Sequence, residues 1–281
     1  MTDWTVDELI CVCISRQVED GEVLAQGLNT PLVMAGFILA QQTHAPNVRF
    51  ASAIGQSICQ EWAPLGVATQ ESAWMEHGLI HPGFVTAALD LLPKFHPKEF
   101  FRPAQIDRFG NTNNIAFGRD VERPRLRLPG TGGIPDVTVY SSRVYFYVPR
   151  HSPVTFVESL DVRSGLGSDA ARRRGDAPRY LVSDLGEFDW ANGTMRLTSI
   201  HPGSTVESVQ RKTRFTLDIA PGLAETAPPT ADELRILREI VDPLGVRKLE
   251  LLSGAARKAH LRTILTEERR QLNSPDASRQ Y

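Results

Sequence analysis

The chain contains little of what would mark a disulfide-stabilised, zinc-binding or membrane-spanning protein. Its 281 residues include three cysteines, Cys11, Cys13 and Cys59, which are too few for a disulfide framework and lack a zinc-ligand spacing. The longest apolar run, residues 31–40, is too short to cross a bilayer. The first ten residues carry no basic segment, so we expect no secretory signal and a cytoplasmic protein.

An excess of charge of either sign is also missing. The formal net charge is −2, with 23% charged residues, so the chain as a whole is not attracted to nucleic acid or an anionic membrane. The sequence has no P-loop, zinc-finger, EF-hand or nucleophile-elbow motif and no repeat of solenoid period. We therefore expect no permanently bound metal or redox cofactor, no nucleic-acid partner and no membrane attachment.

The N-terminal part of the chain predicts a strand–helix–strand unit. A strand at 22–27, an apolar helix at 31–44 and a strand at 47–53 follow a first helix at 5–18. Two strands joined by a helix over so short a length pair in parallel. With 41% hydrophobic residues the chain can also bury a sizeable core. The pattern indicates the α/β class.

Strand and helix patterns alternate through the rest of the chain. We expect strands at 98–106, 143–149, 179–183, 194–200 and 215–219, helices at 84–92, 205–211, 231–241 and 248–271, and a loop at 221–230. A turn at Asn192-Gly193 is typical of a hairpin. The last nine residues have a disordered composition. We divide the chain into an α/β domain, 1–247, and a helical, partly disordered C-terminal tail, 248–281.

Two loops rich in polar residues and glycine stand out between residues 101 and 133. The first follows an apolar strand and carries Gln105, Asp107, Asn111 and Asn113. In open α/β sheets, ligands gather beyond the carboxyl ends of strands. The second, Pro-Gly-Thr-Gly-Gly at 129–133, has three glycines that let backbone N–H groups approach a ligand closely. Taken alone, each loop is equally typical of a tight turn.

These loops carry a resemblance to a known family. Residues 105–113, QIDRFGNTN, resemble the Q-x-D-x-x-G-N-x-N hallmark of family I coenzyme A transferases, and the glycine loop follows it as in their β subunits. Segments 181–188, 201–209 and 228–243 resemble further motifs of the same family in the same order. The nearest branch is the β subunit of the glutaconate CoA-transferase type.

The resemblance has consequences for fold and partners. It implies an open, mostly parallel sheet flanked by helices, with the C-terminal helical tail added. It also implies a separately encoded α subunit, in an αβ or α2β2 assembly, with chemistry on an acyl-CoA thioester at the α/β interface. No cofactor would be bound permanently, because coenzyme A enters as part of the substrate.

One departure from the family pattern concerns the nucleophile. Where the family carries S-E-N-G, this chain has Ser52, Ala53, Ile54 and Gly55, so the glutamate that attacks the thioester is replaced by Ala53. A methyl group cannot form the glutamyl-CoA intermediate. Cys59 and Glu61 lie nearby and are alternatives, although a buried cysteine and a solvated glutamate are the simpler interpretation of each.

The resemblance then suggests roles for individual residues. Gly132 and Gly133 would form an oxyanion hole, and the residues that contact substrate or CoA would be Ser52, Gly55, Gln56, Gln105, Asp107, Asn111, Asn113 and Gly130. Four arginines between the loops, at 119, 123, 125 and 127, either face CoA phosphates, line a subunit interface or are solvated.

Members of this branch that lack the glutamate include hydrolytic and decarboxylating enzymes, so the resemblance implies hydrolysis or decarboxylation of a dicarboxylic acyl-CoA. Two alternatives remain open. One is a true transferase whose nucleophile lies elsewhere, and the other is a partner subunit without catalytic activity. The sequence leaves the acyl group and the role of the tail undetermined.

Overall fold

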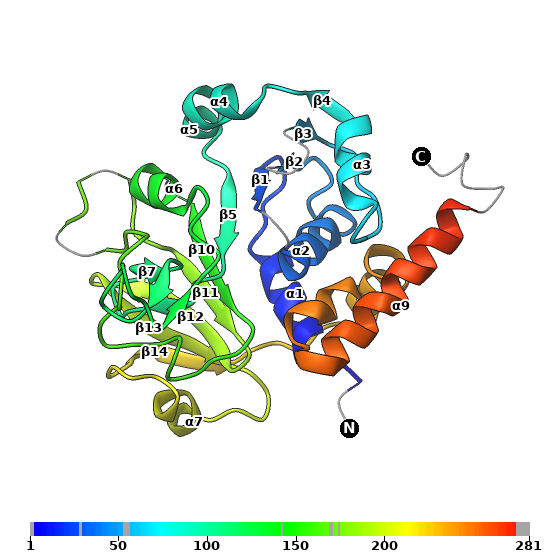
Figure 1. Cartoon of the computed structure of the whole chain (residues 1–281). Coiled ribbons are helices and arrows are strands. Elements are labelled where there is room, and N and C mark those ends of the chain that lie inside the picture. The colour runs from blue at the N-terminus through cyan, green and yellow to red at the C-terminus, as the bar shows by residue number, and fades with distance from the viewer. Residues whose placement is uncertain are drawn as a thin grey trace. The chain divides into compact units, whose positions relative to one another are not determined.

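The computed structural model describes residues 3–27, 30–52, 57–141, 143–168, 171–173 and 175–273. The chain forms two compact units (Figure 1). Unit 1 comprises Met1–Pro97 and Pro229–Tyr281, and unit 2 comprises Lys98–Pro228. We predicted a boundary after residue 247, between the α/β domain and a C-terminal tail. This boundary stays a prediction.

Unit 1 is built on the predicted strand–helix–strand motif. Strands β1 (Val23–Gln26) and β2 (Arg49–Ser52) pair in parallel, joined by α2 (Pro31–Gln41). Every residue of α2 is buried, as its uniformly apolar sequence predicted, and α1 (Val6–Arg16) packs beside it (Figure 1). Both helices and the parallel pairing are confirmed.

Two short antiparallel strands extend this sheet. They are β3 (Ser57–Cys59), which pairs with β2, and β4 (Gly78–Ile80), which pairs with β3. The neighbouring helical segments are α3 (Gln70–Glu76), α4 (Phe84–Thr86), a π-helical segment η1 (Ala87–Leu91) and α5 (Leu92–Phe95). These last three segments follow one another without a break, so the helix predicted at 84–92 continues past Pro93 to residue 95.

The C-terminal segment returns to unit 1 through a buried ionic cluster. It comprises α8 (Ala231–Arg235), a π-helical segment η2 (Ile236–Val241), a 3₁₀ segment η3 (Val246–Glu250) and α9 (Gly254–Leu272). The buried guanidinium of Arg247 binds Asp7, Glu8 and Asp242, each at 2.8 Å. A buried cation needs such a set of partners, so this cluster ties α1 to the C-terminal segment.

The long helix α9 also packs into unit 1. Its Glu268 is almost fully buried and accepts hydrogen bonds from the backbone N–H groups of Val67, at 2.5 Å, and Ala68, at 3.1 Å. The helix begins six residues later than predicted, because a 3₁₀ segment occupies residues 246–250.

Unit 2 contains a six-stranded arrangement in the order β14-β13-β12-β11-β10-β5. Its strands are β5 (Lys98–Phe101), β10 (Val144–Val148), β11 (Tyr180–Ser183), β12 (Gly186–Ala191), β13 (Thr194–Ile200) and β14 (Asp218–Glu225). Pairs β5–β10, β10–β11 and β13–β14 are parallel, whereas β11–β12 and β12–β13 are antiparallel. The carboxyl ends of β5, β10 and β11 therefore meet at one edge.

Smaller elements surround this sheet. They are the hairpins β6 (Gln105–Ile106) with β7 (Thr112–Asn113) and β8 (Ala116–Phe117) with β9 (Leu126–Arg127), and the helices α6 (Ile134–Tyr140) and α7 (Val206–Arg211). The strand predicted at 98–106 is thus two strands, since Pro103 lacks the N–H that a continuous ladder needs.

Two predictions in unit 2 were wrong in detail. The Asn192-Gly193 turn, with φ of 53° and 81°, joins β13 to β12, a strand that we had not separated. The first half of the loop predicted at 221–230 belongs to β14, which ends at Glu225. This strand is mostly exposed and lies at the sheet edge, where Pro221 and Gly222 are tolerated.

Candidate active site

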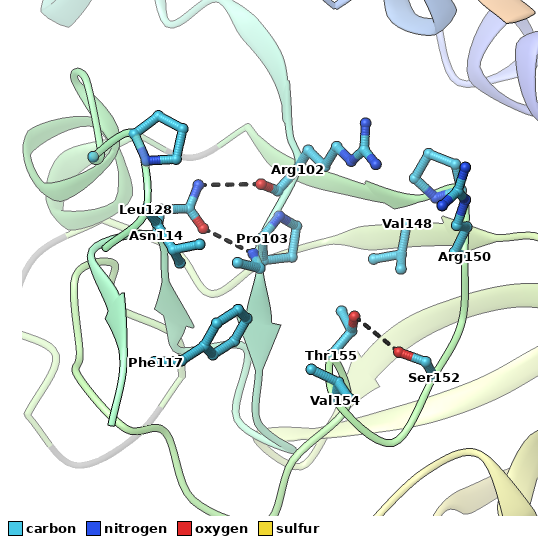
Figure 2. Close-up of a pocket in the computed structure, with 14 residues that line it drawn as sticks. Arg102, Pro103, Asn114, Phe117, Leu128, Val148, Arg150, Ser152, Val154 and Thr155 are labelled. Atoms are coloured by element: carbon cyan, nitrogen blue, oxygen red, sulfur yellow. Dashed lines mark hydrogen bonds between the residues drawn. The ribbon is translucent and has the colours of Figure 1, made fainter. Parts of the chain in front are cut away.

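A pocket of about 590 Å³ lies within unit 2, beyond the carboxyl ends of the parallel strands β5 and β10 (Figure 2). Both segments that leave these strands contribute, as do the stems of the β8–β9 hairpin and the start of the glycine loop. The lining residues are Arg102, Pro103, Ala104, Asn114, Phe117, Leu128, Pro129, Gly130, Val148, Pro149, Arg150, Ser152, Val154 and Thr155.

The pocket combines an apolar wall with two cationic side chains. None of its fourteen lining residues, all in the described part of the chain, is acidic, and the only charged ones are Arg102 and Arg150. Sequence analysis missed both arginines. The available signal was weak: each arginine adjoins a proline, and Arg150 directly follows the strand predicted at 143–149, whereas Arg102 lies inside the strand predicted at 98–106.

The hallmark segment folds into the β6–β7 hairpin, which Asp107 closes. Its carboxylate accepts hydrogen bonds from the backbone N–H of Phe109 at 2.9 Å, from the N–H of Asn111 at 3.0 Å, and from the side-chain amide of Asn111 at 2.9 Å. Gly110 has φ of 78°, and a Cβ there would lie 2.8 Å from the Pro178 ring, so only glycine fits this turn.

The other polar side chains of the hallmark segment also make buried hydrogen bonds within the protein. Asn113 is fully buried and donates to the Gln105 side-chain oxygen and to the Ala116 carbonyl, both at 2.7 Å. The same oxygen of Gln105 accepts from the backbone N–H of Asp161 at 3.1 Å, and Asn111 accepts from the N–H of Gly167 at 2.8 Å.

The structure therefore brings Gln105, Asp107, Asn111 and Asn113 together in one buried hydrogen-bond network. Such satisfied networks fix a unique backbone conformation. Direct contact of these four side chains with a ligand stays a prediction. The geometry shows that their hydrogen bonds hold the loops around the pocket in place.

The glycine loop lies on the surface beside the pocket. Gly130 lines it, and its N–H donates to the Asn114 carbonyl at 3.2 Å. Gly132 and Gly133 follow it and are exposed, and within the described part of the chain their N–H groups have no hydrogen-bond partner. A Cβ on Gly132 would meet nothing within 4 Å. Two adjacent unpaired donors suit the predicted oxyanion hole, whereas the N–H of Gly130 is already engaged.

The position of the missing glutamate lies outside the described residues, together with Gly55 and Gln56. Its neighbour Ser52 ends β2, is 5% exposed, and is paired in register with Ser57 of β3. Of the two alternative nucleophiles, Cys59 is buried and its thiol donates to the carbonyl of His77 at 3.0 Å. Burial raises the pKa of this thiol, which disfavours the reactive thiolate.

Glu61 does not resemble an activated nucleophile either. Its side chain is 70% exposed and pairs with His77 at 2.9 Å. The interpretation as a solvated glutamate therefore fits the described geometry.

A buried polar network lies at the end of β11. The ring of His151 is 3% exposed, stacks on Phe156, and hydrogen-bonds the hydroxyls of Ser183 at 3.1 Å and Thr213 at 2.9 Å. Burial, with a smaller contribution from Lys212, lowers the pKa of His151 to about 3. The imidazole is thus neutral at physiological pH and joins β11 to the segment after α7.

This histidine predicts a loss of stability in mild acid. Its pKa is about 6.5 in the unfolded chain and about 3 in the folded one, so its contribution is complete above pH 6.5 and shrinks as the pH falls. The unfolding free energy should drop by ~1.4 kcal/mol per pH unit below that point. Melting temperatures between pH 8 and pH 5 should fall less steeply for His151→Gln. An equal slope in both proteins would contradict the assignment.

The described residues contain neither a metal-binding cluster nor a membrane-spanning helix. No group of three or more His, Cys, Asp or Glu side chains in this part of the chain is arranged to hold a metal ion. Among the described helices, none is both long and apolar enough to span a membrane.

Comparison with known proteins places these features in context. Residues 100–212 match the sequence profile of the family described as "Coenzyme A transferase". The chain is 30% identical to the "Cholesterol ring-cleaving hydrolase IpdB subunit" of Mycobacterium tuberculosis, over 88% of this chain and 98% of that protein. It is 28% identical to the glutaconate CoA-transferase B subunit of Acidaminococcus fermentans, over 86% of this chain and 94% of that protein.

Solved structures agree. The crystal structure of the Acidaminococcus fermentans glutaconate CoA-transferase matches with a TM-score of 0.74 and 26% identity, covering 86% of this chain and 96% of that one. A variant of the decarboxylase AibA/AibB matches with a TM-score of 0.78 and 26% identity, covering 89% of this chain and all of that one. The predicted α/β fold, with its open and mostly parallel sheet, is confirmed by these matches.

Proposed function

Because the chain belongs to the coenzyme A transferase family, in the branch of the glutaconate CoA-transferase B subunits, we propose that it is the B subunit of a heteromeric enzyme acting on a dicarboxylic acyl-CoA. The reaction is hydrolysis or decarboxylation, and not CoA transfer. The observation that carries this choice is Ala53, which occupies the position of the nucleophilic glutamate. Relatives named as a hydrolase subunit and a decarboxylase support it.

The geometry of unit 2 supports binding of an acyl thioester. The pocket beyond β5 and β10 has a volume typical of small-molecule sites, with an apolar wall and few polar groups. The exposed N–H groups of Gly132 and Gly133 stand next to it along the loop and are suited to a thioester carbonyl. A decayed, non-catalytic subunit would have no reason to keep these loops and a buried network that holds them.

The surface of unit 1 supports a partner subunit. Half of the large apolar side chains that are exposed in the described residues fall within residues 67–95. They are Val67, Met75, Leu79, Ile80, Val85, Leu89 and Phe95. Concentrated exposed apolar surface marks an interaction site, and the matched relatives are subunits of two-component enzymes.

We expect the chain expressed alone to aggregate, because the seven apolar side chains exposed between residues 67 and 95 would stay in contact with water. Co-expression with an A-type subunit of the same family should give a soluble complex, measurable by size-exclusion chromatography. A well-behaved monomer that binds CoA esters without a partner would contradict this.

The reaction is tested on the assembled complex with glutaconyl-CoA or glutaryl-CoA. Free CoA is followed by thiol titration and carbon dioxide by release of label, with and without added acetate as acceptor. The proposal expects one of these products at a rate that does not depend on acetate. Formation of acetyl-CoA, only when acetate is present, would establish the transferase alternative.

A further inference from the structure

We propose that the C-terminal helix α9 is an assembly element, which holds residues 66–80 in the conformation that docks the A subunit. This inference rests on the proposed function and adds to it a role for the tail beyond residue 247. None of the family motifs reaches α9, because the last of them ends at residue 243. One buried carboxylate, the glycine beside it and the surface that follows in the chain carry this assignment.

Glu268 of α9 binds the backbone that leads into α3. It is 2% exposed, and its carboxylate accepts from the N–H of Val67 at 2.5 Å, from the N–H of Ala68 at 3.1 Å and from the Thr69 hydroxyl at 3.3 Å. Hydrogen bonds to a carboxylate are about twice as strong as those between neutral groups. Three donors on consecutive residues converge on this one side chain, which therefore fixes the path of the backbone.

The two segments approach too closely for a side chain to fit between them. A Cβ on Gly66 would lie 2.2 Å from the Thr69 hydroxyl oxygen and 2.5 Å from a carboxylate oxygen of Glu268. The N–H of Leu65 also donates to the carbonyl of Val241 at 2.8 Å, which ties the preceding residue to the C-terminal segment. The C-terminal segment thus holds the start of this stretch at two points.

Buried contacts hold the middle of the same stretch on the body of unit 1. Trp74 of α3 is 2% exposed and packs on Phe50 of β2, with ring centroids 5.0 Å apart. The carbonyl of Trp74 accepts from the Ser57 hydroxyl at 2.8 Å, and β4 then pairs with β3. Because these contacts are buried, α3 and β4 are presented on a fixed base.

The exposed side chains of this stretch form an apolar docking surface. It comprises Val67, Met75, Leu79 and Ile80, which are between 41% and 60% exposed. β4 is also the last strand of its sheet, and among the described residues no further strand pairs with its outer edge. An apolar edge strand needs a cover, because it would otherwise pair with other chains. The matched relatives are subunits of two-component enzymes, so we assign this cover to the A subunit.

The test measures association of this chain with an A-type subunit of the same family in the assembled complex. Glu268→Gln replaces one acceptor oxygen by an amide group that faces backbone donors. We expect the dissociation constant, measured by dilution in the analytical ultracentrifuge, to rise by about tenfold or more, as the loss of charge-assisted hydrogen bonds allows. The matched control is Glu267→Gln on the neighbouring residue, whose partly exposed carboxylate pairs with Arg270. This control should associate as the wild type does, and equal weakening in it would assign the effect to the charge of α9 and contradict the inference.

Turnover and hydrogen exchange separate assembly from general folding. With saturating A subunit, turnover per Glu268→Gln complex should equal that of the wild type. Amide exchange should become faster in residues 65–80 and stay unchanged in the rest of unit 1. Faster exchange throughout unit 1 would assign Glu268 to general stability and overturn the inference. Gly66→Ala, which displaces the carboxylate from the other side, should give the same pattern as Glu268→Gln.

A variant of the docking surface completes the design. Met75→Glu leaves the Glu268 contact in place and adds a charge to the apolar surface, so association should weaken. Leu272→Glu, at a side chain of similar exposure at the end of α9, should leave association unchanged. Wild-type association in Glu268→Gln or in Met75→Glu would contradict the inference and leave the proposed function standing. A tight complex that turns over no CoA ester would end the proposed function and leave this inference standing.

Discussion

Replacing Gly132 with valine is expected to lower turnover of the assembled enzyme by about 10²–10³-fold, the usual cost of losing one oxyanion-hole donor. Gly132 has φ of 53°, a conformation that β-branched residues rarely adopt, and its N–H is unpaired among the described residues. A Cβ at this position meets no atom within 4 Å, so the substitution adds backbone strain but no steric clash, and it places two methyl groups where we expect a thioester to approach. Steady-state kinetics on the purified complex give the measurement.

The control separates blocking of the loop from backbone strain. Gly254, the first residue of α9, has nearly the same φ, 56°, and a Cβ there would likewise meet nothing within 4 Å. Gly254→Val should cost similar backbone strain and leave turnover unchanged. Both complexes should elute as the wild type does on size-exclusion chromatography. Wild-type rates in Gly132→Val would remove the glycine loop from the active site.

Local patterns were sufficient to predict the elements that carry strong signals. The uniformly apolar α2, with Pro31 in its first turn, and the parallel pairing of β1 with β2 follow from composition and spacing alone. The hallmark turn is another such case, since Asp107 and Gly110 have the chemistry that a tight turn requires. These features depend on residues close together in the chain.

Features that depend on distant residues could not be predicted. Asn111 points inward because it accepts from the N–H of Gly167, and Asn113 points inward because it donates to the side chain of Gln105. The identity of a polar residue in a loop does not indicate whether its side chain faces solvent or a buried partner. The ionic cluster of Arg247 joins residues 240 positions apart. Arg247 is buried, whereas an arginine considered by itself is expected to be exposed.

The arginines of the pocket illustrate the same limit. The sequence drew attention to the basic stretch between residues 119 and 127, where charge is dense, whereas the pocket is lined by Arg102 and Arg150, 48 positions apart in the numbering. They are neighbours only because β5 and β10 pair in parallel, and this pairing was not specified by either strand's own sequence.

The second prediction of large effect is that this chain forms no covalent glutamyl-CoA. The family resemblance assigns Ala53 to the position of the nucleophilic glutamate, and a methyl group cannot attack a thioester. Neither nearby substitute is suitable, because Cys59 is buried with a raised pKa and Glu61 is solvated beside His77. The absence of a carboxylate at this position would also favour binding of a dicarboxylic acyl group. A fixed anion in a poorly hydrated site would repel the carboxylate of a dicarboxylic acyl group.

The test is to incubate the assembled complex with glutaryl-CoA, reduce with borohydride, and map modified residues by mass spectrometry. We expect no reduced glutamate on this chain, and finding one at Glu61 or elsewhere would contradict the assignment.

The complementary experiment restores the carboxylate with Ala53→Glu. If the remaining site is that of a transferase lacking one group, the variant should transfer CoA from glutaryl-CoA to acetate and should become trappable by borohydride. Hydrolysis or decarboxylation should slow in the same variant, because the new anion would repel the carboxylate of the substrate. A variant that gains neither transfer nor a trapped adduct would show that the site has been rebuilt around the alanine, beyond the loss of a single carboxylate.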